Sequence, residues 1–390
     1  MLYWDHNATS PLRPEAKAAV LKALDVCGNP SSVHAAGRSA RAIVEEARAQ
    51  VAAFAGAMAS EVIFTSGGSE ANALALRGAI AAAQESGERI LRLFVAATAH
   101  DSVRAVAASL AETTPGLRLT EIPVNENGRI EPEHFRSLLM NGKGRALVSL
   151  IFANNETGTI EDIAGLAQVL RTDGGEGSLL HIDAVSSGYA PIRFSAWDGD
   201  YLSLAAHKIG GPQGVGALIA RDGAPLAALI NGAQEQGHRG GTPNVSGIAG
   251  FGAAARTLQA KFDSECETVA AIRDSFEIAL RHLAPNVVIF AEEELRQKNV
   301  SAFAIPQLQA ETALMALDLD GICVSSGAAC SSGKVTPSHV LAAMGVPESL
   351  ARCALRVSFG PDTGLRDMSE FLTSLRALLR RKLTLAAGGR

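Results

Sequence analysis

Tyr201-Leu-Ser-Leu-Ala-Ala-His-Lys-Ile-Gly-Gly-Pro212 joins a strand-like run to a lysine and a tight turn. The apolar residues at 201–205 predict a buried strand, and the two glycines before Pro212 predict a sharp turn. Lys208 lies between the two, although most lysines lie on the solvated surface. Burial would lower the pKa of this amine and leave it neutral, so that it could attack an aldehyde.

Similar strand-like runs lie on both sides of this stretch and alternate with helical or Gly/Pro-rich pieces. They occupy 62–65, 90–97, 146–152, 179–183 and 215–220. Apolar strands that alternate with helices are typical of a parallel or mixed sheet covered on both faces. The sequence therefore predicts an α/β fold with a mixed, mostly parallel sheet.

The pattern changes near Ser264, where we expect a long helix followed by short strands near 286–290 and 300–305. Another helix, a strand at 354–359 and a closing amphipathic helix complete this part. We predict a large domain at 14–260 and a smaller α+β domain made of 1–13 and 261–390.

Composition excludes several classes of function. Of the 390 residues, 47% are hydrophobic and the formal net charge is -5, so no nucleic-acid or anionic-membrane partner is expected. No basic N-terminal segment precedes an apolar run and no apolar stretch of about 18 residues occurs, which makes a cytoplasmic location the expectation. The five cysteines are scattered without a C-x-x-C pair, so we expect neither a disulfide framework nor a metal site.

Polar residues follow three of the predicted strands. His100 comes after 93–97, Asn155 after 147–152, and Asp183 ends 179–183. These strand ends should meet at one edge of the sheet, which is the usual place for ligands. An acid that ends a buried strand needs a partner, and a protonated pyridine nitrogen would provide one. The plainer interpretations are a polar loop residue for His100 and a helix or turn cap for Asp183.

Thr65-Ser-Gly-Gly-Ser-Glu70 follows a strand and opens a helix. The free N–H groups near Gly68 and Ser69 would lie at the positive end of the helix dipole, where a phosphate fits, although a simple turn capped by Ser69 explains the same residues. Together with Lys208 and Asp183, however, this motif favours pyridoxal phosphate as cofactor, because a lysine amine forms Schiff bases with aldehydes.

Two further residues have settings that suggest chemistry. Cys330 stands in Ser325-Ser-Gly-Ala-Ala-Cys330, a run of small residues that predicts a mobile loop and an accessible thiol. Arg356 interrupts an apolar strand, where we expect a guanidinium to bind a carboxylate of a substrate or of an internal acid. The alternative for Cys330 is an ordinary loop cysteine.

Several motifs in this order closely resemble the NifS/IscS-type cysteine desulfurases of the class V aminotransferase family, nearly end to end. They are Asp5-His-Asn-Ala-Thr9, Gly28-Asn-Pro-Ser-Ser-Val-His34, Phe64-Thr-Ser-Gly-Gly-Ser-Glu70, Ala153-Asn-Asn-Glu-Thr-Gly158, His181-Ile-Asp-Ala-Val185, His207-Lys208, Arg239-Gly-Gly-Thr242 and Ser325 to Cys330. The resemblance implies the pyridoxal-phosphate transferase fold of type I. It also implies a homodimer with the cofactor near the subunit interface.

The resemblance also implies a role for each site residue. Lys208 would hold pyridoxal phosphate as a Schiff base and, once freed, remove the Cα proton of L-cysteine. Cys330 would then attack the substrate sulfur and leave L-alanine. The expected cofactor and substrate contacts are Asp183 at the pyridine nitrogen, His100 stacked on the ring, Asn155 near the substrate and the ring hydroxyl, Gly68, Ser69, His207 and the other subunit's Thr242 at the phosphate, and Arg356 at the substrate carboxylate.

The chain departs from the family pattern at two positions. Ser186 stands three residues after Asp183, where the family usually has a Gln that contacts the ring hydroxyl, and Ala205 replaces a Ser two residues before His207. Ser186 is too short to copy the Gln contact, and Ala205 has no side-chain donor. We therefore expect weaker or differently arranged cofactor binding, by about 0.5–1.5 kcal/mol per lost hydrogen bond.

Three alternatives remain open at this point. An aminotransferase or lyase would need Lys208 and Asp183 but not Cys330, and a selenocysteine lyase would differ mainly in substrate. A degenerate subunit of the same fold would only bind a sulfur-transfer partner. For the desulfurase, the expected acceptor is a sulfur-accepting protein such as an iron–sulfur scaffold.

Overall fold

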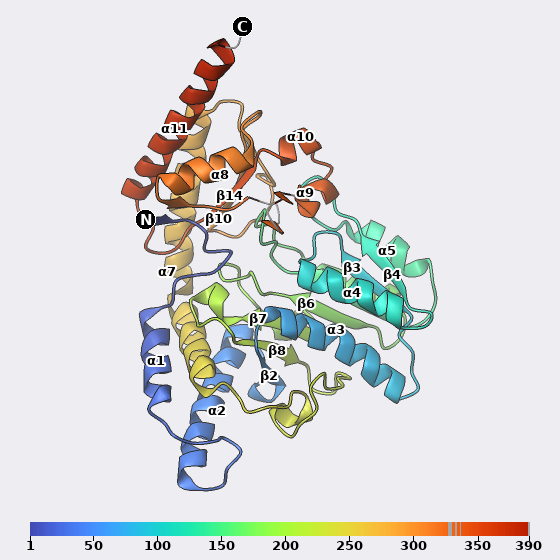
Figure 1. Cartoon of the computed structure of the whole chain (residues 1–390). Coiled ribbons are helices and arrows are strands. Elements are labelled where there is room, and N and C mark those ends of the chain that lie inside the picture. The colour runs from blue at the N-terminus through green and yellow to red at the C-terminus, as the bar shows by residue number, and fades with distance from the viewer. Residues whose placement is uncertain (327–329, 332–333, 336, 389–390) are drawn as a thin grey trace.

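The computed structural model describes residues 1–326, 330–331, 334–335 and 337–388, without side chains at 330–335 and 381–388. Its centre is a seven-stranded sheet with strand order β2-β8-β7-β6-β5-β3-β4 (Figure 1). The strands are β2 (Val62–Thr65), β3 (Arg92–Ala96), β4 (Arg118–Ile122), β5 (Ala146–Ile151), β6 (Leu179–Asp183), β7 (Tyr201–Ala205) and β8 (Gly216–Ala220). All neighbours from β7 to β4 are parallel, whereas β8 runs antiparallel to β7 and β2. The predicted α/β fold with a mixed, mostly parallel sheet is confirmed.

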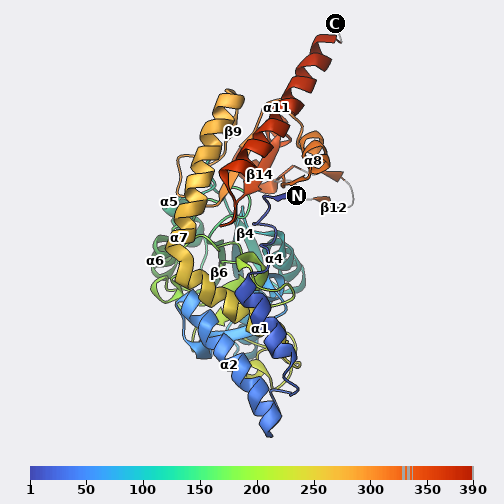
Figure 2. The same ribbon diagram turned by 90° about the vertical axis from the view of Figure 1, so that its left-hand side faces the viewer.

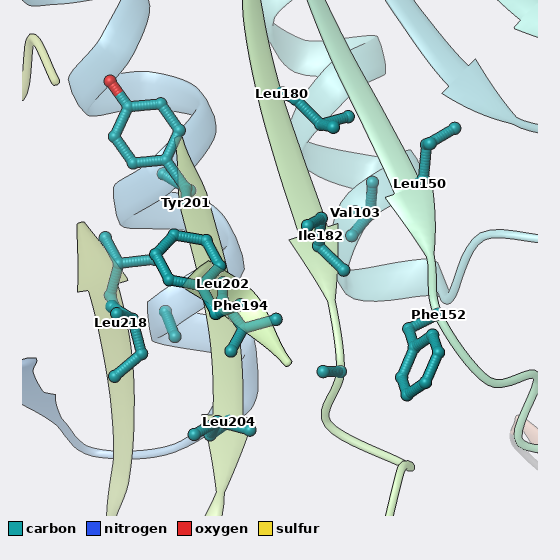
Figure 3. Close-up of a cluster of buried hydrophobic side chains, with 14 of the residues drawn as sticks. Val103, Leu150, Phe152, Leu180, Ile182, Phe194, Tyr201, Leu202, Leu204 and Leu218 are labelled. Carbon is teal, nitrogen blue, oxygen red and sulfur yellow. The ribbon is translucent and has the colours of Figure 1, made fainter. Parts of the chain in front are cut away.

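The strands at the centre of the sheet are buried along their whole length, as their apolar sequences predict. Every residue of β5, β6 and β7 is buried, and Figure 3 shows Leu180, Ile182, Leu202 and Leu204 among the side chains of this core. β4 was not predicted, because it is an edge strand with polar, exposed residues that lack the apolar run of the inner strands.

Helices cover the sheet. α3 (Gly68–Glu85) and α4 (Asp101–Thr113) pack side by side on one face (Figure 1). α6 (Ile163–Asp173) packs against β6 and α5 (Pro132–Met140). α1 (Pro14–Leu24) and α2 (Ala35–Ala55) both pack on α7 (Val245–Leu283). Short 3₁₀ turns at η1 (Ala59–Glu61), η2 (Phe194–Ala196), η3 (Ala206–Ile209) and η4 (Glu235–Gly237) connect these elements.

The helix expected near Ser264 in fact begins at Val245. Three glycines in its first turns obscured that start, because glycine disfavours helices in isolation. A Cβ atom on Gly250 would lie 2.6 Å from Val20, and one on Gly252 would lie 2.6 Å from the backbone of Ala47. The glycines therefore allow α7 to approach α1 and α2 closely.

A second region is built on a three-stranded antiparallel sheet with order β14-β10-β9. Its strands are β9 (Val288–Ile289), β10 (Val300–Ala304) and β14 (Ala354–Ser358), and β1 (Leu2–Tyr3) pairs with β11 (Ile322–Cys323) beside it. Two short strands that are described by their backbone alone, β12 (Cys330–Ser331) and β13 (Lys334–Val335), also pair with each other. The helices here are α8 (Ala310–Leu319), α9 (His339–Ala343), α10 (Glu348–Ala351) and α11 (Leu365–Gly388).

Each region has its own hydrophobic core. In the second region, Trp4 from the N-terminus packs on the rings of Phe276, Phe359 and Phe371. α7 contributes to both cores, with Phe251 in the first and Phe276 in the second, and Figure 2 shows it running along both regions. The predicted domain boundary at 260/261 falls inside this helix, so that division stays a prediction.

Within the described part of the chain, no helix is both long enough and apolar enough to cross a membrane. The same residues contain no group of three or more His, Cys, Asp or Glu side chains arranged to hold a metal ion.

Candidate active site

A cavity of about 180 Å³ lies where β5, β6 and β7 end, beside the first turns of α3 and α4. Eight of the eleven predicted site residues line it: Gly68, Ser69, His100, Asn155, Asp183, Ser186, His207 and Lys208. Parallel strands place their carboxyl ends at one sheet edge, which explains why residues from such distant motifs meet here.

Asp183 ends β6 as a buried carboxylate that two N–H groups bind. Asn72 Nδ2 donates to its Oδ2 at 2.9 Å, and the backbone N of Val185 donates to its Oδ1 at 3.0 Å. Among the described residues, no lysine or arginine forms an ion pair with it. A buried anion without a cation is costly, so this carboxylate is suited to a positively charged ligand group.

Lys208 lies in η3, directly after β7. Its Nζ donates to the backbone oxygen of Asn7 at 2.5 Å. Burial and the nearby charge of Arg356 lower the pKa of Lys208 to about 8, while Asp183 and Asp5 oppose this change. A larger fraction of neutral, nucleophilic amine is therefore present near neutral pH than in an ordinary lysine.

His100 caps the N-terminus of α4 with its ring. Its Nδ1 accepts from the backbone N of Ser102 at 3.1 Å and lies 2.8 Å from Ser102 Oγ. Ser102 Oγ in turn accepts from Asn72 Nδ2 at 3.0 Å. The sequence motifs singled out neither Asn72 nor Ser102. The available signals were an amide one turn after Gly68 in an Ala/Leu-rich helix and a hydroxyl two residues after His100.

The first turn of α3 approaches the cavity closely. A Cβ atom on Gly68 would lie 2.5 Å from Val185 Cγ2, so a larger residue here would force a shift of this turn or of Val185. On the other side, His207 lies with Nδ1 3.2 Å from Thr9 Oγ1. Burial and the charge of Lys208 lower the pKa of His207 to about 4, so its ring is neutral and offers an N–H donor.

Arg356 in β14 binds internal acceptors. Its Nη2 donates to Asp5 Oδ1 at 2.7 Å and its Nη1 donates to the backbone oxygen of Asn155 at 2.9 Å. The buried Nε has no acceptor among the described residues. Arg356 therefore connects the small sheet to the cavity rim through Asn155. Of the two expected carboxylates, the structure supplies the internal one, Asp5.

Besides Arg356, two further predicted residues are not among those that line this cavity. Thr242 is exposed and lines a separate hollow with Ser66 and Arg239 in the same subunit. The backbone of Cys330 pairs with Val335 in the β12–β13 ladder, but its side chain and the loop predicted around it lie outside the described residues.

The end of α9 is attached to the cavity rim. Ser338 Oγ donates to Glu156 Oε2 at 2.5 Å, and His339 Nε2 donates to the backbone oxygen of Ala99 at 3.0 Å. Burial raises the pKa of Glu156 to about 7, with Arg356 and the Ser338 hydrogen bond opposing the rise. Glu156 and Ala99 are the neighbours of Asn155 and His100, so this contact adjoins the site directly.

The side chains present fit pyridoxal phosphate. Asp183 is an unpaired anion for a pyridinium nitrogen, Lys208 is an amine for the aldehyde, and the first turn of α3 offers free N–H groups for a phosphate. A ligand that satisfies all three features must carry a positive charge, a carbonyl group and a negative charge at separate positions. Few small molecules combine these groups.

Comparisons with known proteins agree with this geometry. The family model described as aminotransferase class-V matches residues 2–371. The cysteine desulfurase of Cereibacter sphaeroides is 40% identical over 96% of this chain and 94% of its own length, and the cysteine desulfurase IscS of Dictyoglomus turgidum is 36% identical over 99% and 96%. The X-ray structure of a NifS-like protein from Rickettsia africae has a TM-score of 0.87 and 32% identity, and the match covers 97% of this chain and 99% of that one.

Proposed function

This chain belongs to the class-V aminotransferase family, and we propose that it is a cysteine desulfurase, which converts L-cysteine to L-alanine and transfers the sulfur to Cys330. The observation that carries the proposal is the single cavity in which Asp183, Lys208 and His100 meet. The names of the full-length relatives favour this reaction over that of an aminotransferase.

Pyridoxal phosphate is the cofactor of this family and supplies an electron sink when bound. Asp183 would hold the pyridine nitrogen by charge, and Lys208 would hold the aldehyde carbon. Gly68, Ser69 and His207 would bind the phosphate, joined by Thr242 of a second subunit, because Thr242 lies away from the cavity of its own subunit. His100 would cover the ring, with Asn155 and Ser186 near the ring hydroxyl.

Lys208 would take the proton from Cα of the substrate. Its pKa of about 8 lets the amine accept a proton near neutral pH and release it again. Arg356 would bind the substrate carboxylate through N–H groups that Asp5 and Asn155 leave free, since a guanidinium has five. Asp5 would hold the guanidinium in place.

Cys330 would accept the sulfur. Its thiolate forms a bond to the sulfur of L-cysteine, and the bond between that sulfur and Cβ breaks. The electron pair of the broken bond stays with Cβ, which takes up the proton that the substrate thiol loses and becomes the methyl group of L-alanine. The enzyme keeps a persulfide, so the reaction needs no external oxidant or reductant.

The persulfide would pass to an acceptor protein, and an iron–sulfur scaffold is the acceptor class we propose. A homodimer is part of the same proposal, because Thr242 would complete the phosphate site only across a subunit boundary. We also propose a cytoplasmic location, in keeping with reduced thiols. Mixing the persulfide form with a purified scaffold and measuring sulfur transfer tests the acceptor.

The test of the reaction is a mass spectrum of the full-length protein with pyridoxal phosphate after brief exposure to L-cysteine without reductant. We expect one added sulfur on the peptide that contains Cys330, together with L-alanine. Cys330→Ala should lose the added sulfur, whereas Cys27→Ala, which removes an exposed cysteine elsewhere, should keep it. L-alanine or pyruvate formed while Cys330 stays unmodified would instead indicate another pyridoxal-phosphate reaction.

A further inference from the structure

Two residues outside the predicted site, Asn72 and Ser102, connect Asp183 to His100 by hydrogen bonds. We propose that Asn72 and Ser102 form a relay that holds the His100 ring with its proton on Nε2 and its Nδ1 unprotonated. They are positioning residues, because they act on the reaction through Asp183 and His100. The consequence of the relay for turnover rests on the proposed function.

The orientation of the Asn72 amide is fixed by its partner. Asn72 is 1% exposed, and its Nδ2 lies 2.9 Å from Asp183 Oδ2 and 3.0 Å from Ser102 Oγ. A carboxylate can only accept, so the amide nitrogen, not the amide oxygen, must face Asp183. The second hydrogen of the same NH₂ group then points to Ser102, whose oxygen is an acceptor in this contact.

The hydroxyl of Ser102 has one hydrogen, which it donates in a hydrogen bond to His100 Nδ1. Ser102 Oγ lies 2.8 Å from His100 Nδ1, and the backbone N of Ser102 lies 3.1 Å from the same atom. A backbone N–H can only donate, so Nδ1 must present its lone pair. A neutral imidazole carries a single proton, which therefore lies on Nε2.

The opposite tautomer would remove the acceptor of both Ser102 donors, the backbone N–H and the hydroxyl. A proton on Nδ1 would face the N–H of Ser102 and would leave that group without its acceptor in the first turn of α4. The hydroxyl could then accept the Nδ1 proton with its second lone pair, but its own hydrogen would be left without an acceptor among the described residues. The chain from Asp183 through Asn72 and Ser102 thus selects one tautomer of His100.

The selected tautomer gives the cavity an acid and a base with separate roles. Nδ1 is engaged with Ser102, so Nε2–H is the group that His100 can offer inside the cavity it lines. Lys208, whose buried amine is easily deprotonated, can accept a proton in the same cavity. Distinct environments that separate the roles of two titratable groups are a common feature of acid–base sites.

The test is nitrogen NMR of the full-length protein with ¹⁵N-labelled histidine, recorded both with and without pyridoxal phosphate. A His100→Gln spectrum identifies the His100 signals among those of the nine histidines. We expect Nδ1 of His100 to have the shift of an unprotonated nitrogen. In Ser102→Ala the shift should move toward the average of the two tautomers, because the ratio of tautomers falls by about fivefold when one hydrogen bond is lost.

Three further variants sharpen the result. Ser102→Thr keeps the hydroxyl and should restore the wild-type shift. Ser109→Ala removes another hydroxyl of α4 that accepts from an α3 side chain, Arg77, and should leave the shift unchanged. Asn72→Ala should move it in the same direction as Ser102→Ala, and Ser102→Ala decides the test if Asn72→Ala does not fold.

A protonated Nδ1 in the wild type, or a Ser102→Ala spectrum identical to that of wild type, would overturn the relay. The spectra without cofactor do not depend on any reaction, so this failure differs from a failure of the proposed function, in which the shifts are as expected but no L-alanine forms. In the loaded enzyme, L-alanine formation should fall about fivefold in Ser102→Ala and stay unchanged in Ser109→Ala.

Discussion

Strands β6 and β14 each carry one charged side chain within a buried sheet, Asp183 in the large sheet and Arg356 in the small one. Arg356 meets an internal carboxylate, since Asp5 binds it at 2.7 Å. Asp183 meets only N–H groups, from Asn72 and the backbone of Val185. The fold has therefore balanced the charge of one strand internally and left the other for a ligand.

Lys208 interacts electrostatically with both charges. Arg356 lowers the pKa of its amine, while Asp183 and Asp5 raise it, and burial sets the overall direction. The charges on the two strands thus affect the pKa of Lys208, the residue on which the proposed reaction depends. Three experiments test this comparison of the two strands.

The largest expected effect comes from neutralising one carboxylate on each side of the comparison, Asp5 and Asp183, in the protein without cofactor. Asp5→Asn leaves the Arg356 guanidinium buried without its carboxylate and should lower the free energy of unfolding by about 3 kcal/mol. Asp183→Asn removes a charge that forms no ion pair with a described residue, and it should change the free energy of unfolding by no more than about 1 kcal/mol. Urea unfolding curves measure both, and equal losses would contradict the comparison.

The second effect is a change in pH dependence. Lys208 is a base whose pKa is lowered from 10.5 to about 8, so its neutral amine appears as the pH rises through about 8. Arg356→Gln removes a positive charge and should move this midpoint to higher pH, with roughly threefold less neutral amine at pH 8. The rate of Schiff-base formation with added pyridoxal phosphate, followed by absorbance against pH, measures it.

A matched change far from Lys208 provides the control for this pH profile. Arg296→Gln also removes a buried guanidinium that pairs with an acid, Glu277, but it lies outside the cavity. Its pH midpoint should equal that of wild type. A common movement of the midpoint in both variants would point to a general loss of structure instead of the charge of Arg356.

The smallest effect concerns the cofactor side of the comparison. Ser186 lines the cavity three residues after Asp183, and a longer amide there could reach a ring hydroxyl that serine cannot. Ser186→Gln should tighten the binding of pyridoxal phosphate by about fivefold, the value of one added hydrogen bond. Equilibrium dialysis measures this affinity, and an unchanged or weaker affinity would show that the chain compensates for Ser186 in another way.

Local sequence predicted the inner strands and the residues at their ends. The apolar runs of β5, β6 and β7 were sufficient, because a strand buried on both faces has few polar positions. The same reasoning missed β4, because an exposed edge strand needs no apolar run. It also missed the start of α7, where glycines lower the helix propensity but allow close contact with α1 and α2.

The sequence by itself determined which side chains would gather at the edge of the large sheet, since parallel strands end together and Asp183, His100 and Lys208 each follow one. Only the tertiary structure decided their partners. Arg356 and Asp5 are 351 positions apart, and Asn72 and Asp183 are 111 apart. A hydrogen bond forms only within about 3 Å, and at such separations in sequence that distance is set by how helices and sheets pack, not by any local pattern.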